Sequence, residues 1–309
     1  MPKISKVLFI LAFLVAASGL VSPPVALAAG IVLGLSFTHP YPSASGTFAR
    51  ILLQASVVAL GFGMNLHEVV KAGRSGFLYT ALGISFALAV GLALGKLLNV
   101  RGNSSYLITA GTAICGGSAI AAVGPILHAD EEEMAVSLGT VFILNSIALL
   151  IFPLIGGALH LTQSQFGLWA ALAIHDTSSV VGATARYGAQ ALVIGTTVKL
   201  ARALWIVPLA LATAAFTHSR ARVRFPWFIL LFCLAALANT YVPTFTGVTQ
   251  AFFRLGKLGL TATLFLIGTG ISRSTLRQVG WRPMLQGVVL WMVVGIATLY
   301  FIRTGFIAF

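Results

Sequence analysis

The sequence predicts an all-α, polytopic transmembrane helical bundle, and three observations carry that prediction. Of the 309 residues, 58% are hydrophobic and 8% are charged, whereas a soluble domain carries roughly 25% charged residues. The mean hydropathy is +0.99, and apolar runs recur that reach the roughly 20 residues needed to cross a ~30 Å hydrocarbon core. These runs lack the period-2 alternation of a transmembrane barrel, so helices must satisfy the backbone hydrogen bonds.

We expect about 11 apolar segments, some of them discontinuous helices. No soluble domain, linker or low-complexity tract interrupts them, so residues 1–309 are expected to form a single transmembrane domain. The segments are, in chain order, 6–21, 24–38, 46–65, 76–98, 104–128, 133–158, 165–187, 190–216, 225–240, 249–271 and 284–303.

The first segment has two interpretations. Lys3 and Lys6, the apolar run 7–21 and the small residues 26–28 together resemble a signal peptide with its cleavage site. That site would lie inside the next apolar segment, however, and a multi-span protein needs no cleaved signal. We therefore expect a first transmembrane helix that ends at Pro23.

The formal net charge of +13 raises the question of nucleic acid as a partner. Most Lys and Arg residues stand at the ends of apolar segments, which is typical of topology-setting charges, so we expect no nucleic acid. With the N-terminus in the cytoplasm, the acidic cluster 130–133 falls on the opposite side from a larger group of cations. That cytoplasmic group comprises Lys96, Arg101, Arg220, Arg222, Arg224, Arg273, Arg277 and Arg282.

Two internal similarities indicate inverted repeats. Residues 61–65 align with 268–272, and the segments between them would make the two copies run in opposite directions. Residues 113–120 align without gaps to 173–180, with one segment between them. Two full crossings there would run parallel, whereas a re-entrant segment would let them face each other in opposite senses. The sequence leaves both arrangements open.

The segment 104–128 contains a candidate anion site at Cys115, Gly116, Gly117 and Ser118. Each mid-helix glycine costs about 1 kcal/mol relative to alanine, so the helix can unwind here. A half-helix starting at Gly117 would direct free N–H groups and a partial positive charge towards the membrane midplane. The alternative is a glycine-packed helix crossing without a ligand.

The segment 165–187 contains five consecutive polar residues between apolar flanks: His175, Asp176, Thr177, Ser178 and Ser179. An ionised carboxylate at this depth costs on the order of 2.5–3.5 kcal/mol, which suggests a proton or coupling-ion site, or a partner for a buried cation. Asp176 is also placed to cap a half-helix that starts at Thr177. The alternative is a surface loop that splits the segment.

Segment 190–216 carries Thr196, Lys199 and Arg202 on neighbouring parts of one helix face. Two inward cations would bind an anion or neutralise Asp176; a shifted helix boundary would instead leave them at the interface. Asn145 is expected to link helices. The two cysteines, Cys115 and Cys233, form no disulfide or metal pattern, and we expect no metal or cofactor.

The stretches 113–120, 173–183 and 198–202 resemble the YeiH-like family of bacterial inner-membrane proteins, to which sulfate export is assigned. Length, segment count and segment order are similar over essentially the whole chain. The resemblance implies a multi-pass protein of the bacterial inner membrane. The chain also looks distantly like the bile-acid-symporter and cation–proton-antiporter folds, in which broken helices cross between a core and a panel domain. The segment 165–187 and the eleventh segment fit that ten-helix scheme imperfectly.

We therefore expect a secondary transporter that moves a small anion, namely sulfate or a related oxyanion or sulfonate, in an export coupled to protons or sodium. The lipid bilayer is a partner, and a homodimer is one assembly that we consider. His175 and Asp176 would carry the coupling ion. The expected substrate-binding residues are Cys115, Gly116, Gly117, Ser118, Thr177, Ser178, Ser179, Lys199 and Arg202.

Three other functions compete with this expectation. A cation–proton antiporter of the same fold would use Asp176 as its cation ligand, and a channel would differ in turnover rate. An intramembrane hydrolase would use Ser118, His175 and Asp176. Adjacent side chains diverge on a helix, so a line of nucleophile, base and orienting acid is hard to build from them, and we expect no enzyme.

Overall fold

The computed structural model describes residues 2–37, 40–100, 102–217, 227–242, 246–270 and 279–307. Every regular element in these ranges is a helix. Six helical stretches, one of them 189–217 with α10 and α11 taken together, are long and apolar enough to cross a membrane, and shorter apolar helices accompany them. The predicted class, a polytopic helical membrane protein, is confirmed. Six cations assigned to the cytoplasmic side lie outside the described residues, namely Arg101, Arg220, Arg222, Arg224, Arg273 and Arg277.

The chain divides into two compact units. Unit 1 comprises residues 1–70 and 227–273, and unit 2 comprises 71–226 and 274–309. Each unit is assembled from two separate stretches of chain, so no single linker marks a boundary in the sequence. The single transmembrane domain stays a prediction.

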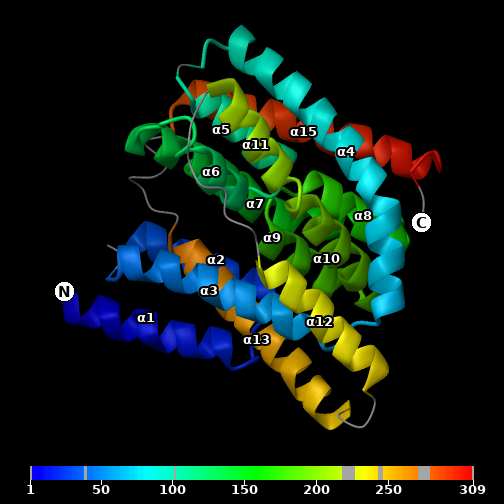
Figure 1. Ribbon diagram of the computed structural model, residues 1–309. Helices are drawn as coiled ribbons and strands as arrows, with labels where there is room; N and C mark the ends of the chain where they lie inside the picture. Colours follow the sequence, from blue (N-terminus) through cyan, green and yellow to red (C-terminus); the bar gives the residue numbers. More distant parts are fainter. Residues whose placement is uncertain are drawn as a thin grey trace. The chain divides into compact units, whose positions relative to one another are not determined.

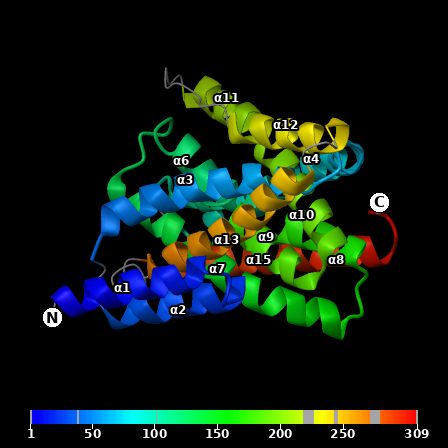
Figure 2. The same ribbon diagram turned by 90° about the horizontal axis from the view of Figure 1, so that it is seen from below.

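Unit 1 is a bundle of apolar helices around α13, which packs against α2 and α3 (Figure 2). Glycines bring the backbones of α2 and α13 into contact, because a Cβ on Gly30 would touch the carbonyl oxygen of Phe265. The helices of unit 1 are α1 (Pro2–Ala17), α2 (Pro23–Ser36), α3 (Pro42–Gly61), α12 (Trp227–Tyr241) and α13 (Thr246–Thr269). From the proposed repeat 61–65 with 268–272, residues 271 and 272 lie outside the described residues.

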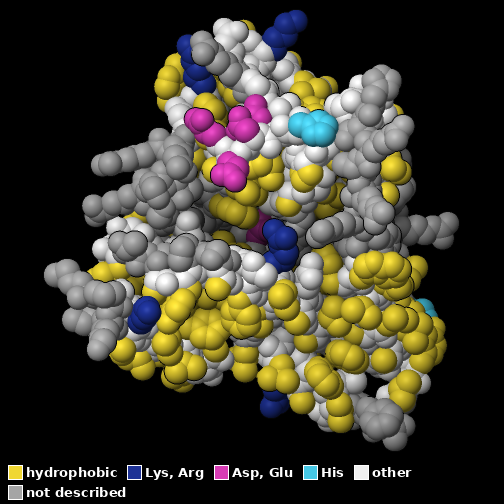
Figure 3. All heavy atoms as spheres, turned by 60° about the vertical axis from the view of Figure 1, so that its left-hand side comes forward, with side chains coloured by type: hydrophobic (Ala, Val, Ile, Leu, Met, Phe, Trp, Pro, Cys, Tyr) yellow, Lys and Arg dark blue, Asp and Glu magenta, His cyan; other side chains and the backbone are white. Residues whose placement is uncertain are grey.

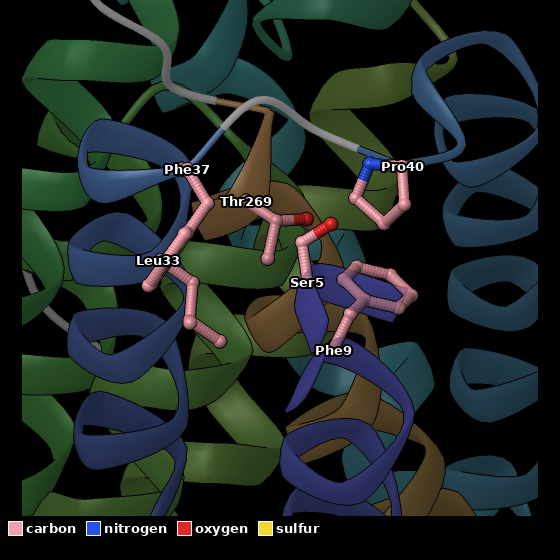
Figure 4. Close-up of a pocket in the computed structure, with 7 residues that line it drawn as sticks. Ser5, Phe9, Leu33, Phe37, Pro40 and Thr269 are labelled. Carbon is pink, nitrogen blue, oxygen red and sulfur yellow. The ribbon is translucent and has the colours of Figure 1, made fainter. Parts of the chain in front are cut away.

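A small hollow in unit 1 lies between α1, α2 and the end of α13 (Figure 4). Ser5, Phe9, Leu33, Phe37 and Thr269 are among the residues that line it. Its volume is about 20 Å³, which is room for roughly one water molecule. This hollow is therefore too small for a polyatomic substrate.

Unit 2 is organised around α7, a helix of 28 residues and hence roughly 42 Å long. Asp130 caps its N-terminus in a reciprocal capping box with Glu133. The helix α4 (Leu66–Leu97) runs from unit 1 into unit 2. The other helices of unit 2 are α5 (Ser104–Ala113), α6 (Gly117–Val123), α7 (Glu131–Ala158), α8 (Gln163–Ala173), α9 (Thr177–Tyr187), α10 (Ala189–Ala203), α11 (Ile206–Thr217) and α15 (Trp281–Arg303).

Three predicted segments are each divided into two helices in the structure. Segment 104–128 contains α5 and α6, 165–187 contains α8 and α9, and 190–216 contains α10 and α11. The first two divisions fall at 114–116 and 174–176, the stretches that the sequence marks by glycines and by consecutive polar residues. These divisions position the candidate site.

Candidate functional site

The segment 103–127, here called hairpin 1, turns back on itself. Its tip is formed by residues 114–116, where Gly116 has a φ of 69° and a ψ of −129°. A Cβ on Gly111, on the first arm, would stand 2.9 Å from the side chain of Ile120 on the second. At the open end, the Asn103 amide donates to the carbonyl oxygen of Leu127 at 3.5 Å. The arms are therefore antiparallel.

The segment 161–188, here called hairpin 2, turns back in the same way, with residues 174–176 at its tip. The rings of Phe166 on α8 and Tyr187 on α9 stack with centroids 3.8 Å apart. The Tyr187 hydroxyl donates to the carbonyl oxygen of Leu161 at 2.7 Å, and the Gln190 N–H donates to the side chain of Gln163 at 3.0 Å. Both ends of this segment thus lie together.

The two hairpins start from opposite ends of α7, as Figure 1 shows, with α5 and α6 towards one end and α8 and α9 towards the other. Near the N-terminus of α7, Glu133 accepts a hydrogen bond from the Asn103 N–H at 2.6 Å. Near its C-terminus, a Cβ on Gly156 would contact both Phe166 and Tyr187. An inverted repeat produces this relation between two similar segments.

The path of hairpin 1 corrects one expectation about sidedness. The sequence placed the acidic cluster 130–133 on the opposite side from Arg282, on the premise that segment 104–128 crosses. Asp130, Glu132, Glu133 and Arg282 instead line one open hollow of about 420 Å³. Hairpin 1 returns to the end at which it began, so Arg282 and these acidic residues share that end. Figure 3 shows acidic side chains gathered on one part of the surface.

The tips of both hairpins meet the middle of α7 at Asn145. The Asn145 Oδ1 accepts hydrogen bonds from the backbone N–H groups of His175 and Asp176, at 3.1 and 3.2 Å. A Cβ on Gly116 would stand 3.5 Å from the Asn145 Nδ2 and 3.4 Å from the Asp176 Cβ. Asn145 is therefore in contact with both tips.

Lys199 joins the carbonyl ends of the two first arms. Its ammonium group, fully buried, donates to the carbonyl oxygens of Ile114 at 3.0 Å and Ile174 at 2.8 Å. These oxygens follow the C-termini of α5 and α8, where helix dipoles concentrate partial negative charge. An ammonium group has three donors, so one remains beyond these two bonds.

Arg202 makes a parallel set of contacts one turn along α10. Its Nε donates to the carbonyl oxygen of Ala113 at 2.7 Å, and its other nitrogens donate to those of Leu172 and, at 3.4 Å, Thr112. The predicted burial of Lys199 and Arg202 is thus correct. The donors described so far face backbone carbonyls, and direct contact of either cation with a substrate stays a prediction.

Asp176 caps α9, as expected. Its Oδ2 accepts hydrogen bonds from the Ser179 N–H at 3.1 Å and from the Ser178 hydroxyl. Within the described ranges, the charged side chains buried in the protein are Asp176, Lys199 and Arg202. Asp176 belongs to the tip of hairpin 2, whereas Lys199 and Arg202 reach the ends of α5 and α8 from α10.

The remaining predicted site residues divide into two groups. His175, Thr177, Ser178 and Ser179 are buried at or just after the tip of hairpin 2, and Cys115 is buried at the tip of hairpin 1. Ser118, in contrast, is exposed, and Gly117 is half-buried against the ring of Phe142. The tips therefore do not bring the Ser118 side chain into the buried cluster.

Several buried polar atoms of unit 2 have no hydrogen-bond partner among the described residues. They include both ring nitrogens of His175, the Asn145 Nδ2 and the hydroxyls of Thr112, Thr196 and Thr197. Sequence reasoning favoured helix linkage over ligand binding for Asn145 and did not single out Thr112. A signal for Asn145 was present, since it is a single amide halfway along an apolar helix. Unpartnered donors and acceptors of this kind are costly unless a ligand or water meets them.

Together, the apolar helices, the paired hairpins and their buried polar tips define a polytopic membrane protein with a polar centre. The family described as "Conserved hypothetical protein 698" matches residues 4–287. The chain belongs to this family, whose curated members carry the name UPF0324 membrane protein, and the YeiH-like family of the motif resemblance is the same one.

Close relatives cover nearly the whole chain. A UPF0324 membrane protein of Bdellovibrio bacteriovorus is 48% identical over 99% of this chain and 96% of its own length. Its counterpart in Bacteroides thetaiotaomicron is 50% identical over 92% of this chain and 87% of its own length. The counterpart in Geobacter sulfurreducens is 51% identical over 89% of this chain and 88% of its own length. No solved structure matches the chain, so the likeness to symporter and antiporter folds gains no support.

Proposed function

We propose that this protein is a secondary transporter of a small oxyanion, with its substrate site where the tips of hairpins 1 and 2 meet α7 and α10. The observation that carries the proposal is the meeting of two opposed helical hairpins around buried cations. Arms of 10 and 11 residues extend roughly 15–17 Å, which is half of a ~30 Å hydrocarbon core. The tips would thus lie near the membrane midplane as re-entrant ends, where non-helical backbone is tolerated if it lines a cavity.

The balance of charge at the tips favours an anion. Each hairpin contributes one helix C-terminus and one N-terminus, whose partial charges of about −0.5 and +0.5 cancel. The side chains then leave two positive charges, on Lys199 and Arg202, against one negative charge on Asp176. A monoanion would neutralise the remainder. A divalent oxyanion such as sulfate would do so together with one proton or sodium ion, which supports coupling at Asp176.

The same balance weighs against the cation–proton antiporter. A cation bound at Asp176 would add to a centre that already carries excess positive charge. A channel would share the fold, and saturable flux at low turnover would separate a transporter from it.

For a hydrolase, His175 would need to contact a nucleophile or an acid, and both its ring nitrogens are unpartnered within the described residues. We propose that the protein is not an enzyme; incubation with lipids or peptides that gave turnover would overturn this.

We further propose a bacterial inner-membrane location with a cytoplasmic N-terminus, and a homodimer as the assembly. The relatives are named membrane proteins and come from bacteria. Lys and Arg residues rather than acidic residues set the orientation of a membrane protein. The acidic cluster beside Arg282 is therefore compatible with a cytoplasmic N-terminus. Labelling of a cysteine placed at the N-terminus in intact spheroplasts tests the orientation, and the mass of the purified protein in detergent tests the dimer.

The experiment that tests the function is thermal unfolding of purified protein with sulfate, sulfite, sulfonates or carboxylates, in sodium or choline salts and at several pH values. A ligand at 100 times its dissociation constant stabilises the native state by about 2.7 kcal/mol, enough to register. A selective rise with one oxyanion class identifies the substrate to load into proteoliposomes. A response to sodium or pH alone, with none to any anion, would overturn the anion proposal.

The coupling role of Asp176 is tested separately. In Asp176→Asn, the amide keeps an oxygen that can accept from Ser179 but removes the charge. We expect oxyanion transport to lose its dependence on pH or on sodium. A variant that transports with unchanged dependence on both would remove Asp176 from the coupling mechanism.

A further inference from the structure

The amide of Asn145 has a fixed orientation. Its oxygen faces two backbone N–H groups, those of His175 and Asp176, and a backbone N–H can only donate. If the amide oxygen and nitrogen were exchanged, the NH₂ group would face the two backbone N–H groups and no hydrogen bond could form. The hydrogen-bond network therefore identifies which atom is the oxygen. The NH₂ group therefore points away from tip 2 with both its donors.

That NH₂ group is buried and has no partner. Asn145 is 3% exposed, and its Nδ2 makes no hydrogen bond to the described residues. Buried amides are nearly always satisfied, because an unmet donor in a low-dielectric interior is costly. An unmet donor halfway along α7, between two hairpin tips, therefore indicates a ligand rather than a packing role.

The tip of hairpin 1 lies beside this donor. The point at which Gly116 would carry a Cβ lies 3.5 Å from the Asn145 Nδ2 and 3.4 Å from both the Val141 Cγ1 and the Asp176 Cβ. These are ordinary van der Waals distances, so Gly116 packs close to the Asn145 amide and to Asp176. Lys199, with one donor beyond its two carbonyl bonds, contacts the same hairpin tip as Asp176 through the carbonyl oxygen of Ile174 at 2.8 Å.

We infer that Asn145 is a substrate-binding residue whose NH₂ group donates to an oxygen of the ligand, and that this donor selects acceptor-only oxyanions against cations. The inference rests on the proposed function and adds a residue and a reason for selectivity to it. A metal or sodium ion needs an oxygen lone pair at this point, and the fixed amide offers hydrogens instead. Asn145 thus holds tip 2 with one atom and binds the substrate with the other.

The test is Asn145→Asp, measured by sulfate- and sodium-dependent thermal unfolding of the full-length protein. The carboxylate keeps an acceptor for the His175 and Asp176 N–H groups and replaces the NH₂ with a second acceptor. We expect sulfate affinity to fall by at least roughly tenfold, and sodium to stabilise the variant. Asn239→Asp makes the same chemical change on α12 in unit 1, where the amide donates to Met64, and should keep the wild-type response to sulfate.

A second variant covers the case in which Asn145→Asp does not fold. Asn145→Ala introduces no charge and lacks the donor, so it too should lose the sulfate response. Retention of the wild-type sulfate shift by either folded variant overturns the role of Asn145 and leaves the proposed transport function standing. If the wild-type protein responds to no oxyanion, both proposals fail together.

Discussion

Ile114 and Ile174 present their carbonyl oxygens to one ammonium group, that of Lys199, at 3.0 and 2.8 Å. The two isoleucines occupy equivalent positions in the gapless alignment of residues 113–120 with 173–180. One cation therefore joins equivalent points of two opposed hairpins. It also meets the partially negative C-termini of α5 and α8, which explains how a fully buried lysine is accommodated.

Replacement of Lys199 with methionine should lower the stability of the protein. Both carbonyl oxygens would lose a charged donor, and each such bond contributes about 1.5–3 kcal/mol, so we expect a net loss of roughly 3 kcal/mol after the desolvation of the lysine is recovered. Thermal and denaturant unfolding in detergent measure the loss. Lys257→Met is the matched control, because Lys257 is exposed and its Nζ lies over the ring of Phe253 at 4.4 Å. A Lys199→Met variant as stable as this control would contradict the bridging role.

Arg202→Lys tests whether shape matters in addition to charge. The guanidinium reaches Ala113 on hairpin 1 and Leu172 on hairpin 2 with different nitrogens, and a single ammonium nitrogen cannot reproduce that fork. We expect a loss of about 2 kcal/mol in unfolding free energy, since at least one charged hydrogen bond disappears. Arg186→Lys, at an exposed position near the end of α9, should be neutral. Equal stability of the two variants would show that positive charge alone suffices at position 202.

The fold class was predictable because it depends on composition and on the length of apolar runs, and these are properties of the sequence itself. The predicted segment 133–158 differs from α7 at its start alone, where the capping box of Asp130 and Glu133 begins the helix at Glu131. The positions of the hairpin tips were predictable as well, since glycines and consecutive polar residues mark them.

The return of each hairpin was not predictable from hydropathy. Segment 104–128 is long and apolar enough to cross a bilayer, and contacts between its own arms, such as Gly111 with Ile120, decide that it turns back. The partners of Lys199 were equally hidden, because every residue carries a carbonyl oxygen and the sequence does not single out Ile114 or Ile174. Burial of the cations could be predicted from their place in an apolar run, but their acceptors could not.

A disulfide across the open end of hairpin 2 would test the return of that segment directly. A Cβ on Gly188 would touch the end of the Gln163 side chain, so the two positions face each other across the open end, and we expect cysteines at 163 and 188 to form a disulfide. In a continuous helix the same positions would be roughly 37 Å apart. Mass spectrometry of oxidised, protease-digested protein detects the linked peptides and distinguishes them from pairs that involve Cys115 or Cys233.

The control for this pair places the cysteines at 163 and 173, about 15 Å apart along α8, where no direct disulfide can form. Efficient oxidation of the 163–188 pair with none of the 163–173 pair supports the hairpin. Failure of the first pair to oxidise, in protein that still unfolds cooperatively, would mean that segment 161–188 does not close.

Gly116→Ala tests the space beside the Asn145 amide without altering that residue. Gly116 has a φ of 69° and a ψ of −129°, a conformation that costs a residue with a side chain about 1–3 kcal/mol. The added methyl group would also lie 3.5 Å from the Asn145 Nδ2, where it would crowd a ligand oxygen that accepts from that NH₂ group. We therefore expect both lower stability and at least roughly tenfold weaker sulfate binding, measured by sulfate-dependent unfolding.

Gly305→Ala separates these two effects. Gly305 also has a positive φ, 75°, but a Cβ there would meet no atom within 4 Å. This control carries the backbone strain alone, so it should lose stability and keep the sulfate response of the wild-type protein. If Gly116→Ala behaves like Gly305→Ala in sulfate, the methyl group does not compete with a ligand, and the substrate contacts must lie elsewhere on the tips. If only Gly116→Ala loses the response, the ligand oxygen lies between Gly116 and Asn145.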